Sequence, residues 1–386
     1  MKIARLEAIL VRAAISPERY FTNETGEVRA QEALLVRVTT EGGLVGYGET
    51  TVDHGARESA IAQIDGVFAP MLKGQSAHDI TRLWELMYNG SRAHYALDRG
   101  HGFPVAAMRR GVTVGAVSAV DMALWDVKGK ALGVPVWQLL GGKVRDRLPT
   151  YASGGWAPEE KIGDQFRGYI ESGGFRACKM RVGVMDGVLA KSVRRVQAAR
   201  RALGPDVDIM VDAHGTMTVS EAKRFCRLVS ECNLNWFEEP VSPNDMPGCA
   251  EVRASTDIPI ASGERCSTRY DVMDLLQHRA IDILQPELAV IGGLTEAMRV
   301  AGLAAGYNVR LAPHNWGACV LYAANMAYGA AVPNVFIMEH CMGADPLIRE
   351  LPENPFASKD GFVEVRDAPG LGVTINEDYL KAHRIN

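Results

Sequence analysis

The chain has 386 residues, and its 42 Lys and Arg residues nearly balance its 46 Asp and Glu residues, giving a formal net charge of -4. This length predicts two or three domains, or one large barrel with an additional domain. The charge argues against a nucleic-acid-binding protein, and the 47% share of hydrophobic residues excludes a disordered or collagen-like chain.

No membrane span or secretion signal is expected. The longest stretch without formal charge, 311–338, is interrupted by prolines and asparagines, and charged residues interrupt the first seven positions of the chain. The seven cysteines include no C-x-x-C pair, so we expect reduced thiols rather than zinc ligands. Together these features predict a cytoplasmic protein.

The N-terminal part of the chain is expected to mix strands and helices. Strand patterns occur at 3–11, 33–38 and 44–49. The polar loop at 16–29 is long enough to act as a lid or specificity loop. From residue 58 to about 130 the apolar residues recur at helical spacing, which predicts helices.

From residue 148 onward, predicted strands alternate with predicted amphipathic helices. The eight strand candidates are 148–153, 175–182, 208–213, 234–240, 259–264, 281–288, 308–314 and 335–339. This alternation predicts an α/β fold with a parallel barrel of the TIM type. A doubly wound open sheet is the alternative, but no G-x-G-x-x-G follows a first strand. Residues 362–365 are expected to form one more strand, which returns to the N-terminal domain.

Three carboxylates stand at the ends of consecutive predicted barrel strands. Asp212, Glu238 and Glu264 are 26 residues apart in each step, which is one strand-helix unit. The C-terminal ends of barrel strands face the active site, so these side chains should converge. Converging carboxylates repel one another unless a cation lies between them, and a set of oxygen ligands suits Mg2+. The sequence therefore predicts a magnesium site.

Charged and titratable residues at the other strand ends suggest the substrate and the proton chemistry. Lys179 and Arg181 are two apart on one strand, so they share a face and could bind an anion whose charge grows during reaction. His314 ends the seventh strand and Glu287 the sixth. A carboxylate on one ring nitrogen would leave the other free for proton transfer.

With these residues in place, the chain resembles the enolase superfamily, and within it the mandelate racemase subgroup. The resemblance covers nearly the whole chain. The motifs that carry it are Gly46-Tyr47-Gly48-Glu49, Ser118-Ala119-Val120-Asp121-Met122-Ala123-Leu124-Trp125-Asp126, Leu139-Leu140-Gly141-Gly142, Trp236-Phe237-Glu238-Glu239-Pro240, Gly263-Glu264, Gly292-Gly293 and Gly370-Leu371-Gly372.

The resemblance implies a modified (β/α)7β barrel beneath an α+β capping domain. The expected divisions are a capping domain at 1–125, the barrel at 126–345, and a C-terminal segment at 346–386 that returns to the capping domain. The resemblance also implies that Mg2+ binds the three carboxylates. It further implies abstraction of the proton α to a substrate carboxylate, which gives an enediolate. Mg2+, Lys179 and a protonated Glu339 would stabilise that enediolate, and Glu339 matches the family glutamate that hydrogen-bonds the substrate carboxylate.

Three positions depart from the family pattern. Arg181 stands where a second lysine usually serves as a base, and arginine stays protonated in almost any environment. Glu287 replaces the aspartate that usually partners the histidine. His214 stands two residues after the first metal ligand, where many relatives have asparagine, and a similar histidine donates a proton in mannonate dehydratases of this superfamily.

These departures favour an acid-sugar dehydratase, a hydro-lyase that converts an aldonate or aldarate to a 2-keto-3-deoxy acid. His314 would take the α-proton, and either His314 or His214 would return a proton to the departing β-hydroxyl. A racemase or epimerase with Lys179 as second base remains open. A muconate-type cycloisomerase is less favoured because Gln285-Pro286-Glu287 stands where that subgroup has a lysine. A non-catalytic barrel that binds a sugar acid is the alternative from another class.

Substrate selection is expected in the loops of the capping domain. Candidate contacts are Arg19, Tyr20, Asn23 and His54, with His94 or His101 from the loop at 91–110. The expected partner is thus a small-molecule carboxylate, with no nucleic acid and no membrane. The family resemblance also implies a homo-oligomer, from a dimer to an octamer.

Overall fold

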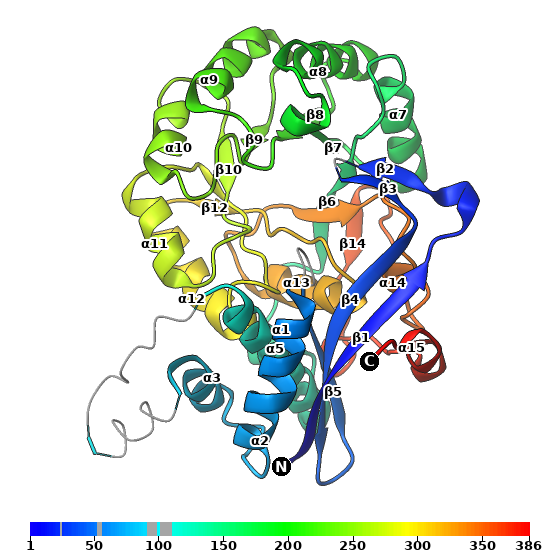
Figure 1. Cartoon of the computed structure of the whole chain (residues 1–386), viewed down its shortest axis with the longest axis vertical. Helices are drawn as coiled ribbons and strands as arrows, with labels where there is room; N and C mark the ends of the chain where they lie inside the picture. The colour runs from blue at the N-terminus through cyan, green and yellow to red at the C-terminus, as the bar shows by residue number, and fades with distance from the viewer. Residues whose placement is uncertain (24, 52–55, 91–98, 101–109) are drawn as a thin grey trace.

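The computed structural model describes residues 1–23, 25–51, 56–90, 99–100 and 110–386 (Figure 1). Its N-terminal part contains an antiparallel sheet in the order β1-β4-β5, formed by β1 (Ile3–Ala14), β4 (Ala30–Thr40) and β5 (Val45–Thr50). All three strands predicted there are confirmed. Side chains alternate across the sheet, so Ile9 and Val11 join the core shared with the barrel, whereas Ala8 and Leu10 join the core of the capping domain.

Helices cover the face of this sheet that carries Ala8 and Leu10. They are α1 (Arg57–Gln63), the π-helical segment η3 (Ile64–Phe68), α2 (Ala69–Leu72), α3 (Ile80–Asn89) and α5 (Val112–Leu132). Helix α5 crosses β5 closely because Gly48 has no side chain: a Cβ there would lie 1.8 Å from the Ala119 carbonyl oxygen. The predicted division between residues 125 and 126 falls inside α5. Within the described residues, no helix has both the length and the apolar character needed to cross a membrane.

The barrel contains all eight predicted strands, which run parallel. They are β6 (Arg147–Gly154), β7 (Ala177–Arg181), β8 (Asp208–Asp212), β9 (Trp236–Glu238), β10 (Ile260–Ser262), β11 (Ile283–Leu284), β12 (Arg310–Leu311) and β13 (Met338–Cys341). The sheet order β12-β11-β10-β9-β8-β7-β6-β13 follows the chain, and a backbone bridge between Leu311 and Val335 joins its two ends. The predicted fold class, a capped TIM-type barrel, is confirmed.

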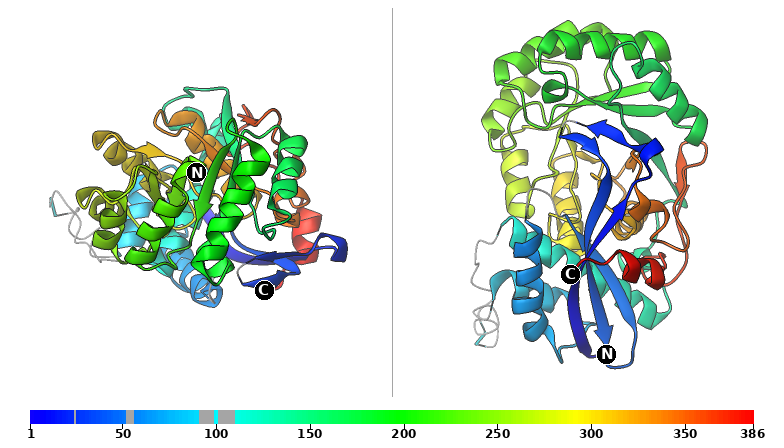
Figure 2. Two further views of the ribbon diagram at one scale, coloured as in Figure 1. Left: turned by 90° about the horizontal axis from the view of Figure 1, so that it is seen from above. Right: turned by 45° about the vertical axis from the view of Figure 1, so that its right-hand side comes forward.

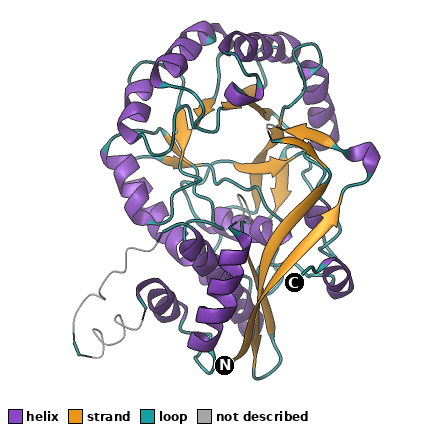
Figure 3. Ribbon diagram, in the orientation of Figure 1, coloured by secondary structure: helices purple, strands orange, loops and turns teal. Residues whose placement is uncertain are grey.

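Between consecutive strands, helices form the outer ring of the barrel (Figures 2 and 3). They are α7 (Ile162–Gly173), α8 (Leu189–Leu203), α9 (Val219–Leu228), α10 (Met246–Arg253), α11 (Arg269–Gln277), α12 (Gly293–Gly306) and α13 (Cys319–Ala331). Shorter elements are η1 (Pro17–Arg19), β2 (Phe21–Asn23), β3 (Gly26–Val28), α6 (Val136–Leu139), η4 (Gly183–Met185), η5 (Ser230–Cys232) and α14 (Pro346–Arg349). Inside the barrel, Tyr151, Met210 and Trp236 belong to a separate apolar cluster that fills its centre.

The C-terminal segment differs from the prediction in one respect. Strand β14 (Phe362–Glu364) exists, but it pairs antiparallel with the barrel strand β6 and not with the capping sheet. The return to the capping domain is made instead by α15 (Glu377–His383) and the residues after it. The Asn386 side chain accepts a hydrogen bond from the Leu10 N–H at 2.8 Å and donates one to the Ala8 carbonyl at 3.1 Å.

Candidate active site

Three buried carboxylates meet at the C-terminal end of the barrel. Asp212 ends β8, Glu238 ends β9, and Glu264 lies two residues beyond β10, so each follows its own strand. One oxygen from each lies within 4.8 Å of the other two. Glu264 Oε2 is buried and accepts no hydrogen bond from the described residues. This group of hard oxygen donors fits Mg2+, which prefers carboxylates and retains further positions for water or substrate.

Two cations from β7 lie against these carboxylates. Lys179 Nζ is 2.7 Å from Glu238 Oε1 and 2.9 Å from Glu339 Oε1, and Arg181 forms an ion pair with Asp212. Burial lowers the pKa of Lys179, but the charges of Glu238 and Glu339 outweigh burial and raise it above its usual value. Lys179 is therefore held as a cation, which suits the binding of an anion better than the removal of a proton.

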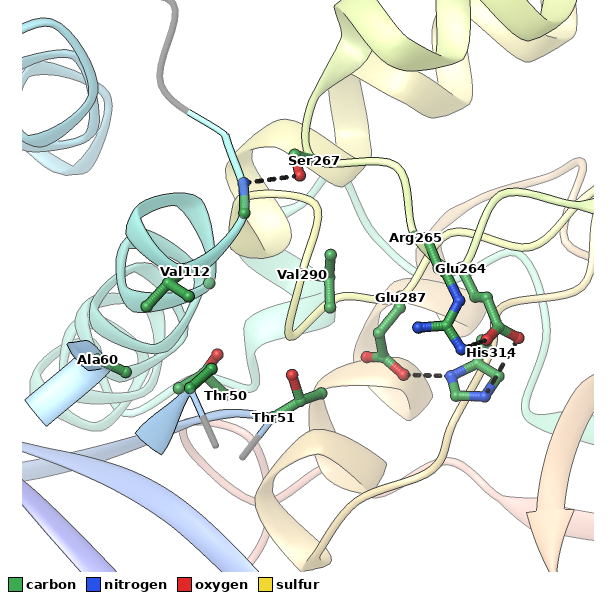
Figure 4. Close-up of a pocket in the computed structure, with 13 residues that line it drawn as sticks. Thr50, Thr51, Ala60, Val112, Glu264, Arg265, Ser267, Glu287, Val290 and His314 are labelled. Carbon is green, nitrogen blue, oxygen red and sulfur yellow. Dashed lines mark hydrogen bonds and ion pairs between the residues drawn. The ribbon is translucent and has the colours of Figure 1, made fainter. Parts of the chain in front are cut away.

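His314 and Glu287 form a hydrogen-bonded pair beside the carboxylates (Figure 4). His314 Nδ1 lies 2.6 Å from Glu287 Oε2, and a backbone bridge joins the two residues. The other ring nitrogen, Nε2, lies 3.6 Å from Glu264 Oε2. Burial lowers the pKa of His314, but Glu264, Glu339 and Glu287 together raise it to about 10. The ring therefore becomes a base only when the negative charge around it is reduced.

His214 lies at the Asp212 side of the carboxylate group, whereas His314 lies at the Glu264 side. The His214 Nε2 is 3.2 Å from Asp212 Oδ2, and the His214 backbone N–H donates to Asp212 Oδ1 at 2.8 Å. The backbone adopts φ of 46°, a left-handed conformation that is uncommon for a residue other than glycine. The structure thus brings a second imidazole to the site from a different strand end.

Glu339 on β13 completes the charged group. Its Oε2 accepts a hydrogen bond from the Asn315 N–H at 2.9 Å, and its Oε1 faces Lys179. Burial raises the pKa of Glu339, but the positive charges of Lys179, His314 and Arg181 lower it well below the usual range. This arrangement favours the ionised carboxylate, in contrast to the protonated form that the family resemblance suggested.

The capping-loop predictions have different outcomes. Asn23 Oδ1 accepts hydrogen bonds from both the N–H and the hydroxyl of Thr25, so this side chain stabilises the β2–β3 turn. Arg19 ends η1, and the Tyr20 ring lies under the Arg29 guanidinium at 5.7 Å. His54, His94 and His101 lie outside the described residues.

An aromatic contact that the sequence reasoning missed joins the capping hairpin to the barrel. The Phe21 ring lies 4.9 Å from the Trp156 ring, and Trp156 meets Trp316 edge to face at 5.9 Å. The Arg181 guanidinium lies over the Trp316 ring at 5.6 Å. Phe21 lies between the predicted contacts Tyr20 and Asn23, so an aromatic residue in this loop was the available signal.

Two further residues, whose role was missed from the sequence, orient Glu238, one of the predicted metal ligands. Gln285 Nε2 donates to Glu238 Oε2 at 2.7 Å, and Trp236 Nε1 donates to the same oxygen at 3.1 Å. Gln285 begins the Gln285-Pro286-Glu287 run, which directly follows β11. Here its amide donates to a carboxylate oxygen, which fixes the orientation of the Glu238 side chain.

A cavity of about 250 Å³ lies next to the His314–Glu287 pair (Figure 4). The capping domain contributes Thr50, Thr51, Ala60 and Val112 to its lining, and the barrel contributes Glu264, Arg265, Ser267, Glu287, Val290 and His314. The cavity therefore offers room for a small molecule between the two domains, with the imidazole and the carboxylates at one end.

Comparisons with known proteins agree with this architecture. Residues 7–141 match the mandelate racemase / muconate lactonizing enzyme N-terminal domain, and residues 161–379 match the enolase C-terminal domain-like family. A D-galactarolactone cycloisomerase from Agrobacterium fabrum is 34% identical and covers 91% of each chain. A D-galactonate dehydratase from Ralstonia nicotianae is 33% identical over 89% of each chain. The crystal structure of a racemase from Streptomyces coelicolor A3(2) with bound magnesium has a TM-score of 0.86 and 32% identity, covering 99% of this chain and 100% of that one.

Proposed function

The chain belongs to the mandelate racemase / muconate lactonizing enzyme family, and from this premise we propose that it dehydrates an aldonate or aldarate to a 2-keto-3-deoxy acid. It is a sugar-acid enzyme of the enolase superfamily, of the hydro-lyase type found among mandelate racemase-like proteins. Mg2+ is the cofactor of this superfamily. What we propose is the substrate class, an aldonate or aldarate, and the role of each residue in the reaction.

The observation that carries dehydration is the asymmetry of the bases around the carboxylates. The His314 imidazole has a carboxylate partner on Nδ1, and its Nε2 lies 3.6 Å from Glu264 Oε2. Arg181 stands at the position where a second base would be expected. Lys179 is already charged and is paired with Glu238 and Glu339. A racemase needs an effective base on each face of the α-carbon, whereas a dehydratase needs one base and one acid.

In the proposed reaction, His314 Nε2 removes the proton from the α-carbon while Glu287 holds the ring through Nδ1. Mg2+ on Asp212, Glu238 and Glu264 would supply positive charge to a substrate carboxylate. The Lys179 ammonium offsets the negative charge that grows there. A proton from His314, or from His214, then goes to the β-hydroxyl, which leaves as water. The remaining enol becomes the 2-keto-3-deoxy acid.

The test is to incubate the protein and MgCl2 with a library of aldonates and aldarates. We expect at least one sugar acid to yield a keto acid that reacts with semicarbazide. If no member does so, while an α-proton exchanges in D2O without loss of water, the chain is a racemase or epimerase and the dehydratase proposal is wrong.

A second candidate is a cycloisomerase acting on a sugar-acid lactone. The 34% identity to a D-galactarolactone cycloisomerase favours it. The same α-proton would leave, but the ring oxygen on the β-carbon would be the leaving group in place of a hydroxyl. Adding aldarolactones to the library separates the two candidates, because ring opening consumes lactone without releasing water.

The cytoplasmic location and the homo-oligomer predicted from the sequence also remain proposals. The family resemblance supports an assembly between a dimer and an octamer. Size-exclusion chromatography with light scattering would give the mass directly, and a value of one 41.9 kDa chain would contradict the oligomer.

A further inference from the structure

A buried carboxyl of the capping domain reaches the start of a barrel helix. Glu49 lies at the end of β5 and is 2% exposed. Its Oε2 accepts a hydrogen bond from the Leu321 N–H at 2.8 Å, and its Oε1 accepts one from the Ala318 N–H. The first N–H groups of a helix have no partner within that helix, so Glu49 supplies partners at the start of α13 from another domain.

The loop that precedes α13 carries His314. Only three residues separate His314 from Ala318, and within this loop the Asn315 N–H donates to Glu339 at 2.9 Å. The loop also packs closely on Glu49: a Cβ on Gly317 would lie 2.6 Å from Glu49 Oε1. Because both ends of so short a loop are bound, movement of its Glu49 end would displace the imidazole.

The loop that carries Glu287 is held by the capping domain in a similar way. The Thr50 hydroxyl donates to the Ala289 carbonyl at 3.0 Å, and the Ser118 hydroxyl accepts from the Gly292 N–H at 2.8 Å. Asp121 on α5 accepts from the Thr295 N–H at 2.9 Å near the start of α12. Both members of the imidazole–carboxylate pair therefore lie on loops that the capping domain binds.

We propose that Glu49 is a positioning residue for proton transfer: from the capping domain it holds the start of α13 and thereby sets His314 relative to Glu287 and Glu264. This proposal rests on the proposed function, since it takes His314 as the base. Nothing in the strand itself requires a carboxyl here, and burying one is costly unless its hydrogen bonds are used. Burial raises the pKa of Glu49 to about 8, although both N–H donors lower it.

The experiment compares Glu49→Ala and Glu49→Gln with a matched control, Glu7→Ala. Glu7 is also a buried carboxylate of the capping sheet, at 7% exposure, but its partners are Arg5, Arg37 and Arg384, which are remote from the barrel loops. For each variant we would measure kcat, KM, Mg2+ affinity, Tm and the pH titration of the His314 ring by NMR with labelled histidine. The His314→Asn variant assigns that signal.

We expect Glu49→Ala to lower kcat by about 10- to 100-fold, with a smaller change in KM and little change in Mg2+ affinity. The His314 titration should shift as well. Glu49→Gln keeps one acceptor oxygen, so its kcat and His314 titration should lie between those of Glu49→Ala and wild type. If Glu49→Ala does not fold, Glu49→Gln still allows both quantities to be measured. Glu7→Ala should lower Tm without changing kcat or the His314 signal.

The proposal is overturned if the Glu49 variants behave like Glu7→Ala, with a lower Tm but an unchanged kcat and His314 titration. Failure of the proposed function would look different. If wild-type protein turns over no sugar acid, the function is wrong, but the NMR titration still decides whether Glu49 positions His314.

Discussion

Two groups of buried carboxyls in this molecule are stabilised in opposite ways. At the barrel mouth, Asp212 and Glu238 face the side-chain cations Arg181 and Lys179. In the capping domain, Glu49 and Asp121 face backbone N–H groups at the starts of α13 and α12. Side-chain cations can rotate toward a substrate, whereas backbone donors cannot. The barrel mouth is thus suited to exchange of charged partners, and the capping contacts to fixed geometry.

The largest expected effect comes from removing one charge at the barrel mouth. Glu238→Gln should weaken Mg2+ binding by more than about 100-fold and make turnover undetectable, because a neutral amide is a poor ligand for a hard cation. Isothermal titration with MgCl2 measures the affinity. The neighbouring Glu239→Gln is the matched control, since Glu239 is equally buried but is not part of the carboxylate triad. Equal losses in both variants would contradict the assignment of Glu238.

His314→Asn tests proton transfer while Asp212, Glu238 and Glu264, the three predicted metal ligands, stay in the chain. We expect turnover to fall by about 1,000-fold or more, since the proton acceptor is lost, while Mg2+ affinity stays near the wild-type value. Steady-state kinetics and the same calorimetry give both numbers. Activity close to wild type in this variant would move the base to Lys179.

Asp121→Ala tests the fixed side of the comparison. Asp121 is fully buried and accepts hydrogen bonds from both the N–H and the hydroxyl of Thr295. Its removal leaves these donors without partners, at a cost of about 1–3 kcal/mol each. We therefore expect Tm to fall by several degrees while Mg2+ affinity stays unchanged. A loss of Mg2+ binding at unchanged Tm would show that the capping contacts and the barrel mouth are not separable.

The smallest expected effect is a pH dependence of stability. Burial raises the pKa of Glu49 from 4.5 to about 8, so the folded state binds this proton more tightly than the unfolded state. The stabilisation is present below pH 4.5 and is lost as the pH rises toward 8. The Tm of wild type relative to Glu49→Gln should therefore fall by a few degrees between pH 5 and pH 8. Parallel Tm curves across this range would contradict the raised pKa.

The sequence was sufficient for those parts of the site that strand position determines. Asp212, Glu238, Glu287 and His314 lie at or near strand ends, and a parallel barrel brings such positions to one edge whatever the loops do. Contacts between distant segments were not predictable in this way. Phe21 meets Trp156 only because the capping hairpin folds over the barrel, and no periodicity in either segment reports that approach.

The hydrogen-bond partners of single polar residues could not be predicted from the sequence either. Asn23 was a reasonable candidate for a substrate contact, but its side chain stabilises its own turn, as asparagine often does. Glu49 was visible in a motif of the family resemblance, yet its partners are backbone atoms about 270 residues further along the chain. Backbone partners leave no trace in residue identity, so the sequence could mark Glu49 without indicating what it binds.

The contacts along the outer edge of β1 bear on how copies of this chain can associate. An exposed edge strand offers unpaired N–H and C=O groups to another molecule, which leads to strand addition and aggregation. Here the Asp65 side chain accepts from the Ala8 N–H at 2.8 Å, and Asn386 occupies the Leu10 N–H and the Ala8 carbonyl. These side chains and the Ile385 N–H, which donates to the Leu10 carbonyl, block continuation of the sheet between molecules along this stretch. An ordered assembly would therefore not be built by adding a strand along this stretch of β1.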